Sequence, residues 1–83
     1  MIFLIFTAEG LAEAASEIQA EQATVWLNPD LKNTNDYAKL VESSCDCFFL
    51  SEQADPTNER SVINALNQVE KSTHDTEIYV EYL

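Results

Sequence analysis

The sequence predicts an α/β fold, a three-layer α/β/α sandwich in which three helices cover a four-stranded, mostly parallel sheet. Strand-like and helix-like segments alternate along the whole chain, which is the pattern of parallel βαβ units. The first segment is apolar at every position, as in a strand that helices cover on both faces. The 83 residues are 46% hydrophobic and include one glycine and two prolines, so we expect a single domain over 1–83.

The first half of the chain supplies two strands and a helix. Residues 2–6 are an unbroken apolar run and are predicted as a buried strand. A helix should open near Glu9 and extend to about Ala23, because this stretch is rich in alanine. Thr24–Leu27 carries β-branched and aromatic residues and is predicted as a second, short strand. The turn residues of 28–30 then end it.

The second half continues the alternation. A helix is predicted over about 36–43, because 33–35 offers capping side chains. A largely apolar strand is predicted over 45–50. Asp55-Pro56 combines a capping carboxylate with a proline suited to a first helical turn, so a third helix should run from there to about Lys71.

The last predicted strand, 77–83, alternates between apolar and polar side chains, so one of its faces is wetter and we predict an edge strand. The apolar face carries Ile78, Val80 and Tyr82, and the polar face carries Glu77, Tyr79 and Glu81. Right-handed crossovers limit the winding, and with strand one in the interior we expect the strand order 2-1-3-4. In that order the first helix covers one face of the sheet alone, and the second and third helices lie on the other.

The charge of the chain restricts its partners. Fifteen Asp and Glu residues against four Lys and Arg give a net charge of −11. Such a surface repels nucleic acid and anionic membranes and attracts basic protein surfaces. We therefore expect a basic nucleic-acid-binding protein or complex as the partner, with no direct contact to nucleic acid or membrane. An acidic surface that only maintains solubility is the alternative.

Four glutamates spaced four residues apart lie on the first predicted helix, and we call them the glutamate row: Glu9, Glu13, Glu17 and Glu21. Each step climbs about 6 Å and turns by about 40°, which gives a slanted row about 18 Å long. Like charges at this spacing destabilise a helix by roughly 0.2–0.5 kcal/mol per pair. No Lys or Arg occurs in 1–31 to offset them, which predicts a row of contacts to Lys and Arg of a partner. Weaker candidates for the same surface are Asp30, Asp36 and Glu42.

In size, charge and the glutamate row, the chain resembles the small acidic DNA-mimic inhibitors that phages encode, such as anti-CRISPR and anti-restriction proteins. The row repeats negative charge along a line, as the phosphates of one DNA strand do. The resemblance implies a protein that occupies a Lys/Arg-lined nucleic-acid groove of an effector complex. It also implies action in the cytoplasm, that of the host if the protein is phage-encoded.

A second resemblance involves the end of the first strand. Glu9-Gly10 follows that strand directly and is similar to the first motif of Toprim domains, which occur in primases, topoisomerases and some nucleases. The resemblance implies a degenerate or active metal-dependent nuclease domain, in which an Asp-x-Asp pair after strand three would bind magnesium. Here Glu52 and Asp55 follow strand three with a different spacing.

Other chemistry finds little support in the sequence, and we predict a non-enzymatic protein without cofactor or metal. Gly10 is the only glycine, so no phosphate-binding loop can form. Cys45 and Cys47 are too close in sequence for a comfortable disulfide. Zinc usually needs four ligands, and His74 is the single histidine of the chain. We therefore expect both cysteines to pack on one face of strand three. A third hypothesis is a small scaffold or a homodimer formed through the last strand.

Overall fold

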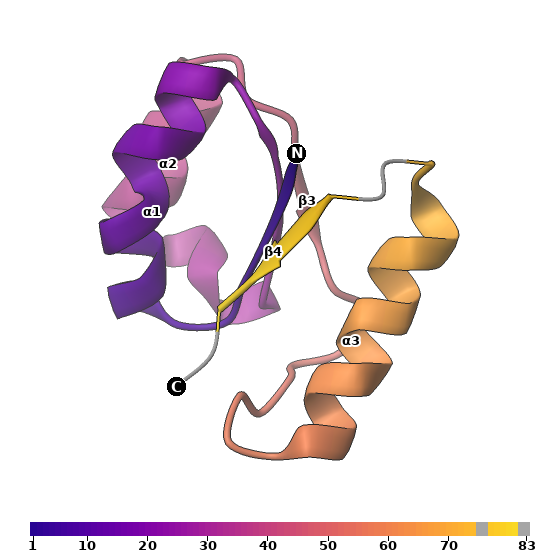
Figure 1. Cartoon of the computed structure of the whole chain (residues 1–83). Coiled ribbons are helices and arrows are strands. Elements are labelled where there is room, and N and C mark those ends of the chain that lie inside the picture. Colours follow the sequence, from indigo (N-terminus) through magenta and orange to yellow (C-terminus); the bar gives the residue numbers. More distant parts are fainter. Residues whose placement is uncertain (75–76, 82–83) are drawn as a thin grey trace.

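Four short strands form one sheet that lies between two layers of helices in the computed structural model, which describes residues 1–74 and 77–81 (Figure 1). The elements follow in the predicted alternation, with one added 3-10 helix, η1: β1 (Ile2–Ile5), α1 (Ala8–Glu21), β2 (Thr24–Leu27), η1 (Pro29–Asn33), α2 (Asn35–Glu42), β3 (Cys47–Phe49), α3 (Glu59–Ser72) and β4 (Ile78–Val80). The α/β fold with its four-stranded parallel sheet and three α-helices is confirmed. Tyr82 and Leu83, the end of the predicted last strand, lie outside the described residues.

The order of the strands is β3-β2-β1-β4, and every neighbouring pair is parallel. The predicted order 2-1-3-4 is wrong, because it places β3 beside β1 instead of beside β2. Burial explains the difference. In β2, Val25, Trp26 and Leu27 are buried, and β2 therefore needs a neighbour on each side, whereas β3 and β4 are only partly buried and form the two edges. The predictions that strand one is interior and the last strand is an edge are confirmed.

This order also changes which helices share a face. The steps from β1 to β2 and from β2 to β3 run in the same direction, so right-handed crossovers place α1 and α2 on one face of the sheet. The chain then crosses back through α3 to β4, and α3 lies alone on the opposite face (Figure 1). The expectation that the first helix lies alone is therefore wrong. On the face that α1 and α2 cover, no helix lies over the edge strand β4, whose Tyr79 is exposed there. On the face that α3 covers, the edge strand β3 is left open in the same way, and its Phe48 is exposed.

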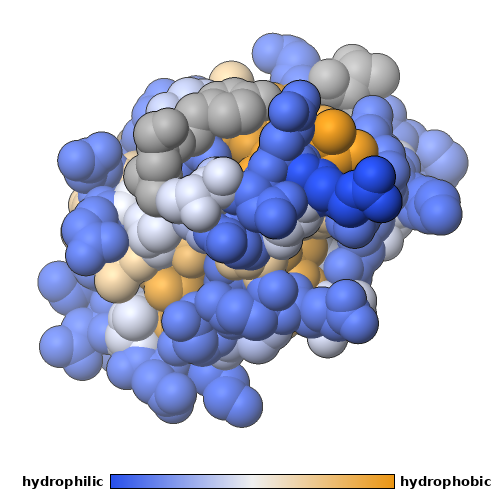
Figure 2. Space-filling model, turned by 90° about the horizontal axis from the view of Figure 1, so that it is seen from below, coloured by the Kyte–Doolittle hydropathy of each residue, from blue (hydrophilic) through white to orange (hydrophobic). Residues whose placement is uncertain are grey.

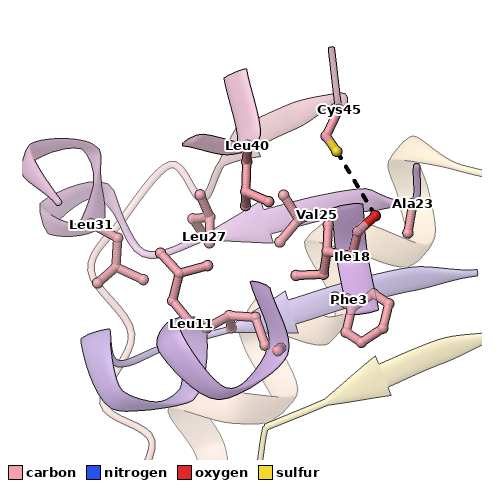
Figure 3. Close-up of a cluster of buried hydrophobic side chains, with 11 residues drawn as sticks. Phe3, Leu11, Ile18, Ala23, Val25, Leu27, Leu31, Leu40 and Cys45 are labelled. Carbon is pink, nitrogen blue, oxygen red and sulfur yellow. Dashed lines mark hydrogen bonds between the residues drawn. The ribbon is translucent and has the colours of Figure 1, made fainter. Parts of the chain in front are cut away.

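The sheet separates two hydrophobic cores. Between the sheet and the two helices α1 and α2, Phe3, Leu11, Ile18, Val25 and Leu40 pack together (Figure 3). Between the sheet and α3 lie the alternate residues of the same strands, with helix residues against them: Ile2, Leu4, Phe6, Trp26, Ala65 and Val69. The strands are thus buried on both faces, as the continuous apolar run of β1 predicts.

Asn28, directly after β2, is fully buried and connects three segments at the carboxyl end of the sheet. Its Nδ2 donates to the carbonyl oxygens of Phe6 (3.0 Å) and Ala54 (2.8 Å), and its Oδ1 accepts from the backbone N–H of Ala54 (2.7 Å). The side chain thereby replaces the hydrogen bonds that these loops lose in leaving the strands. A residue that the sequence identifies only as a turn former is therefore a structural crosslink.

The third helix begins at Glu59, later than the predicted Asp55-Pro56. The carbonyl of Asp55 accepts from the backbone N–H of Asn58 (3.1 Å), so this proline lies inside a turn. Asn58 then caps the helix, since its Oδ1 accepts from the backbone N–H of Ser61 (3.1 Å). Asparagine and aspartate are comparable caps, and proline suits the second position of a turn as well as a first helical turn. The prediction that Asp55-Pro56 starts the third helix is therefore wrong, because these two residues form the turn that precedes it.

Candidate functional site

The glutamate row lies along α1 with all four side chains exposed to solvent. Leu11, Ala14, Ala15 and Ile18 bury the opposite side of the helix against the sheet, which turns the carboxylates outward. Within the described part of the chain, none of the four carboxylates takes part in a hydrogen bond or an ion pair. The row is therefore an unneutralised line of negative charge.

Contacts between α1 and α2 set the direction in which the row faces. Gln19 of α1 donates from Nε2 to the Oγ of Ser43 (3.1 Å) and to the carbonyl of Lys39 (3.5 Å). Successive members of the row turn by about 40°, away from this contact with α2. Glu13 and Glu17 consequently stand on the side of α1 that faces β4, the uncovered edge strand.

A groove of about 340 Å³ lies between α1 and β4. Its lining comprises Phe3, Ile5, Glu9, Gly10, Glu13, Ala14, Glu17, Tyr79 and Glu81, and we call it the α1–β4 groove. Tyr79 forms the outer part of an apolar floor: its side chain is 55% exposed, and its ring centroid lies 5.4 Å from that of Phe3. The groove exists because no helix covers β4 on this face. It therefore combines an aromatic floor with three carboxylates of the row.

Glu81 closes the end of the groove at the start of α1. Its side chain is buried, and its Oε1 accepts from the backbone N–H groups of Phe6 (2.7 Å) and Thr7 (3.0 Å). Its Oε2 accepts from the hydroxyl of Thr7, which also caps α1 by accepting from the backbone N–H of Gly10 (3.0 Å). A Cβ at Gly10 would lie 2.2 Å from the Cδ of Glu81, so glycine leaves the space that this carboxylate fills.

The remaining sequence candidates lie elsewhere. Asp30 is exposed on η1, Asp36 stands in the first turn of α2, and Glu42 is exposed at the end of α2. None of them lines the α1–β4 groove, and Lys32 and Lys39 interrupt the acidic surface on the same two elements. The structure thus brings together Glu9, Glu13 and Glu17, places Glu21 beyond them at the end of α1, and leaves the three weaker candidates on a mixed-charge surface.

The groove itself was not predicted, although part of its pattern can be read from the sequence. The alternation in 77–81 correctly places Tyr79 and Glu81 on one face of the last strand. That this face borders the glutamate row depends on β4 pairing with β1, which no local pattern reports.

At the end of the molecule where the strands finish, hydrophilic residues dominate the surface and hydrophobic ones show between them (Figure 2).

The residues of the Toprim-like hypothesis are divided between two faces of the molecule. Glu9 lines the α1–β4 groove, whereas Glu52 lies in a separate hollow against α3. Asp55 accepts from the hydroxyl and the N–H of Thr57, and these hydrogen bonds lower the pKa of its carboxyl. Among residues 1–74 and 77–81, no three or more His, Cys, Asp or Glu side chains gather into a group that could hold a metal ion.

The two cysteines pack against the same core, between the sheet and the two helices α1 and α2, as predicted, but Cys45 lies just before β3 and not within the strand. Cys45 is buried, and its Sγ points toward the carbonyl of Ile18 (Figure 3). Burial raises the pKa of Cys47 to about 11, and the nearby Cys45 and Asp46 add to the rise. Both thiols are free.

Alkylation of Cys47 by iodoacetamide is expected to be slow at pH 8 and to accelerate as the pH approaches about 11, because the thiolate is the reacting form. Mass spectrometry of the folded protein over this pH range measures the rate. The same protein unfolded in urea serves as the reference and should react at the rate of an ordinary thiol. A fast reaction of the folded protein at pH 8 would show instead that Cys47 is an activated thiol.

Comparisons with known proteins add no relative. No protein-family model matches the chain, and searches of curated proteins and of solved structures found no match either. Among the described residues, no helix has both the length and the apolar character needed to cross a membrane.

Proposed function

We propose that this protein is an acidic inhibitor of the DNA-mimic kind, which acts in the cytoplasm by occupying a basic nucleic-acid-binding surface of a partner protein. It acts by binding and not by catalysis. The observation that carries the proposal is the glutamate row, four exposed carboxylates on one helix without a cationic neighbour in the described chain. Anti-CRISPR proteins are one class of inhibitor that would fit this description.

The energetics of α1 support a binding role for the row. Three like-charged pairs at four-residue spacing destabilise the helix by roughly 0.6–1.5 kcal/mol in total. Glu21 adds to this near the negative end of the helix dipole, where the last turn holds no basic residue. For a domain of this size, with a stability of only several kcal/mol, the cost is appreciable. A partner rich in Lys and Arg removes it, because each pairing replaces a repulsion by an attraction.

The spacing of the row also suits a nucleic-acid-binding surface. Its carboxylates rise by about 6 Å per step, close to two phosphate steps of about 3.4 Å along one strand of DNA. Basic side chains arranged to meet alternate phosphates can therefore meet successive glutamates. A surface of this kind competes with nucleic acid and shares its sensitivity to salt.

The test is capture of partners on the immobilised protein from a nuclease-treated lysate of the organism in which it acts, followed by competition with duplex DNA. We expect the captured protein to bind DNA and the inhibitor in mutually exclusive fashion, with an affinity that falls as salt rises. Glu13→Lys with Glu17→Lys should weaken binding by at least tenfold. Glu52→Lys with Glu70→Lys changes the net charge equally on exposed residues outside the row and should weaken it by less than threefold.

Stability measurements separate lost binding from lost folding in the same variants. Lysines at positions 13 and 17 remove two of the three repulsive pairs of the row, so urea denaturation should show stability equal to the parent or higher by up to about 1 kcal/mol. Equal losses of affinity in the two double variants would reduce the proposal to a nonspecific effect of net charge. A captured protein that binds DNA and the inhibitor at the same time would contradict it.

A further inference from the structure

We infer that the α1–β4 groove is the seat of an arginine side chain from the basic partner, held between the Tyr79 ring and the carboxylates of Glu13 and Glu17. The inference rests on the proposed function and specifies its central contact. It predicts a selectivity for arginine over lysine that a purely electrostatic row would not have.

The lining of the groove fits a cation with a flat, weakly hydrated head. The floor is apolar and aromatic, with Tyr79 55% exposed above Phe3, while the carboxylates of Glu9, Glu13 and Glu17 stand along one wall. A guanidinium stacks on an aromatic ring and donates in its own plane to carboxylates. An ammonium is a compact, strongly hydrated charge that gains little from the ring face.

Glu81 adds negative charge to the end of the groove at the start of α1 and binds donors there that an anion could otherwise use. A helix N-terminus ordinarily attracts anions through its free N–H groups. At the start of α1, the Glu81 carboxylate accepts from the N–H groups of Phe6 and Thr7 and from the Thr7 hydroxyl. These three donors, which lie just before the helix, are therefore already bound to a carboxylate of the protein itself, and three exposed carboxylates line the rest of the groove.

Charge argues against a second copy of the chain as the occupant. β4 is an edge strand, and an edge strand can pair with another molecule. A second copy would bring a net charge of −11 and its own glutamate row toward the carboxylates of this groove. An arginine-bearing segment of a basic protein has the complementary charge, so its approach to the groove is not opposed by charge repulsion.

The experiment compares octa-arginine with octa-lysine, both fluorescently labelled, in anisotropy titrations at two salt concentrations. The unmodified protein should bind octa-arginine roughly fivefold more tightly than octa-lysine. Tyr79→Leu retains an apolar contact with Phe3 and should abolish this preference while leaving octa-lysine binding within twofold. NMR shifts on octa-arginine binding should centre on Gly10, Ala14 and Tyr79.

Phe48 provides a matched control on the opposite face. It is 47% exposed on the other edge strand, and its ring centroid lies 5.2 Å from that of Trp26. Among the described residues, the hollow beside it is lined by one carboxylate, that of Asp46, instead of a row. Phe48→Leu should leave both affinities unchanged. Equal binding of the two peptides by the unmodified protein, or a preference that survives Tyr79→Leu, overturns the inference. The proposed function is tested separately. It stands if Glu13→Lys with Glu17→Lys weakens binding of the captured partner, and it fails if that affinity does not change.

Discussion

Replacement of Asn28 by alanine is expected to lower the free energy of unfolding by roughly 2–4 kcal/mol, a large fraction of the stability of so small a domain. The side chain is fully buried and makes three hydrogen bonds, to the carbonyl of Phe6 and to the carbonyl and N–H of Ala54. Alanine leaves these groups without partners in a place that water does not reach, so their desolvation is no longer offset. Urea denaturation followed by far-UV circular dichroism measures the effect.

Two further variants define the cause. Asn28→Asp retains an acceptor for the Ala54 N–H but turns a carboxylate toward two carbonyl oxygens, so it should destabilise at least as much as alanine. Asn67→Ala makes the same change at an exposed position of α3 and should alter the stability by less than 0.5 kcal/mol or so. A loss below about 1 kcal/mol in Asn28→Ala would mean that the crosslink does not hold the loops.

The second large effect is expected at the contact of Gly10 with Glu81. Glu81→Ala should cost roughly 2–3 kcal/mol, because it removes the acceptor for the N–H groups of Phe6 and Thr7 and for the Thr7 hydroxyl. Gly10→Ala should cost a similar amount for a different reason. The new Cβ would lie 2.2 Å from the Cδ of Glu81 and must displace the carboxylate from its donors.

These two changes should be strongly non-additive. Once Glu81 is alanine, the space beside Gly10 is open, and alanine at position 10 also favours the helix by up to about 1 kcal/mol. The double variant should therefore be no less stable than Glu81→Ala alone, with a coupling energy of about 2 kcal/mol or more in a double-mutant cycle measured by urea denaturation. Additive losses would show that the carboxylate and the glycine act independently.

Local patterns were sufficient for the order of the four strands and three α-helices along the chain and for the outward row, because helical periodicity and strand alternation are properties of neighbouring residues. They missed η1 and placed the start of α3 too early. The apolar segment 45–50 looked like an interior strand, yet β3 lies at the edge, where Phe48 is 47% exposed. The bonds from Glu81 to Phe6 and Thr7 join residues more than 70 positions apart. The groove depends on the same long-range pairing, and for this reason the sequence indicated its charges but not its floor.

In parallel sheets of this topology, ligands enter the crevice at the point where successive connections leave for opposite faces, at the carboxyl ends of two adjacent strands. That point lies here between β1 and β4. The carboxylate of Glu81 lies there, next to the start of the first helix, where such sheets commonly bind the anionic group of a ligand. The buried side chain of Glu81 thus fills, with the protein's own negative charge, the end of the crevice nearest the first helix.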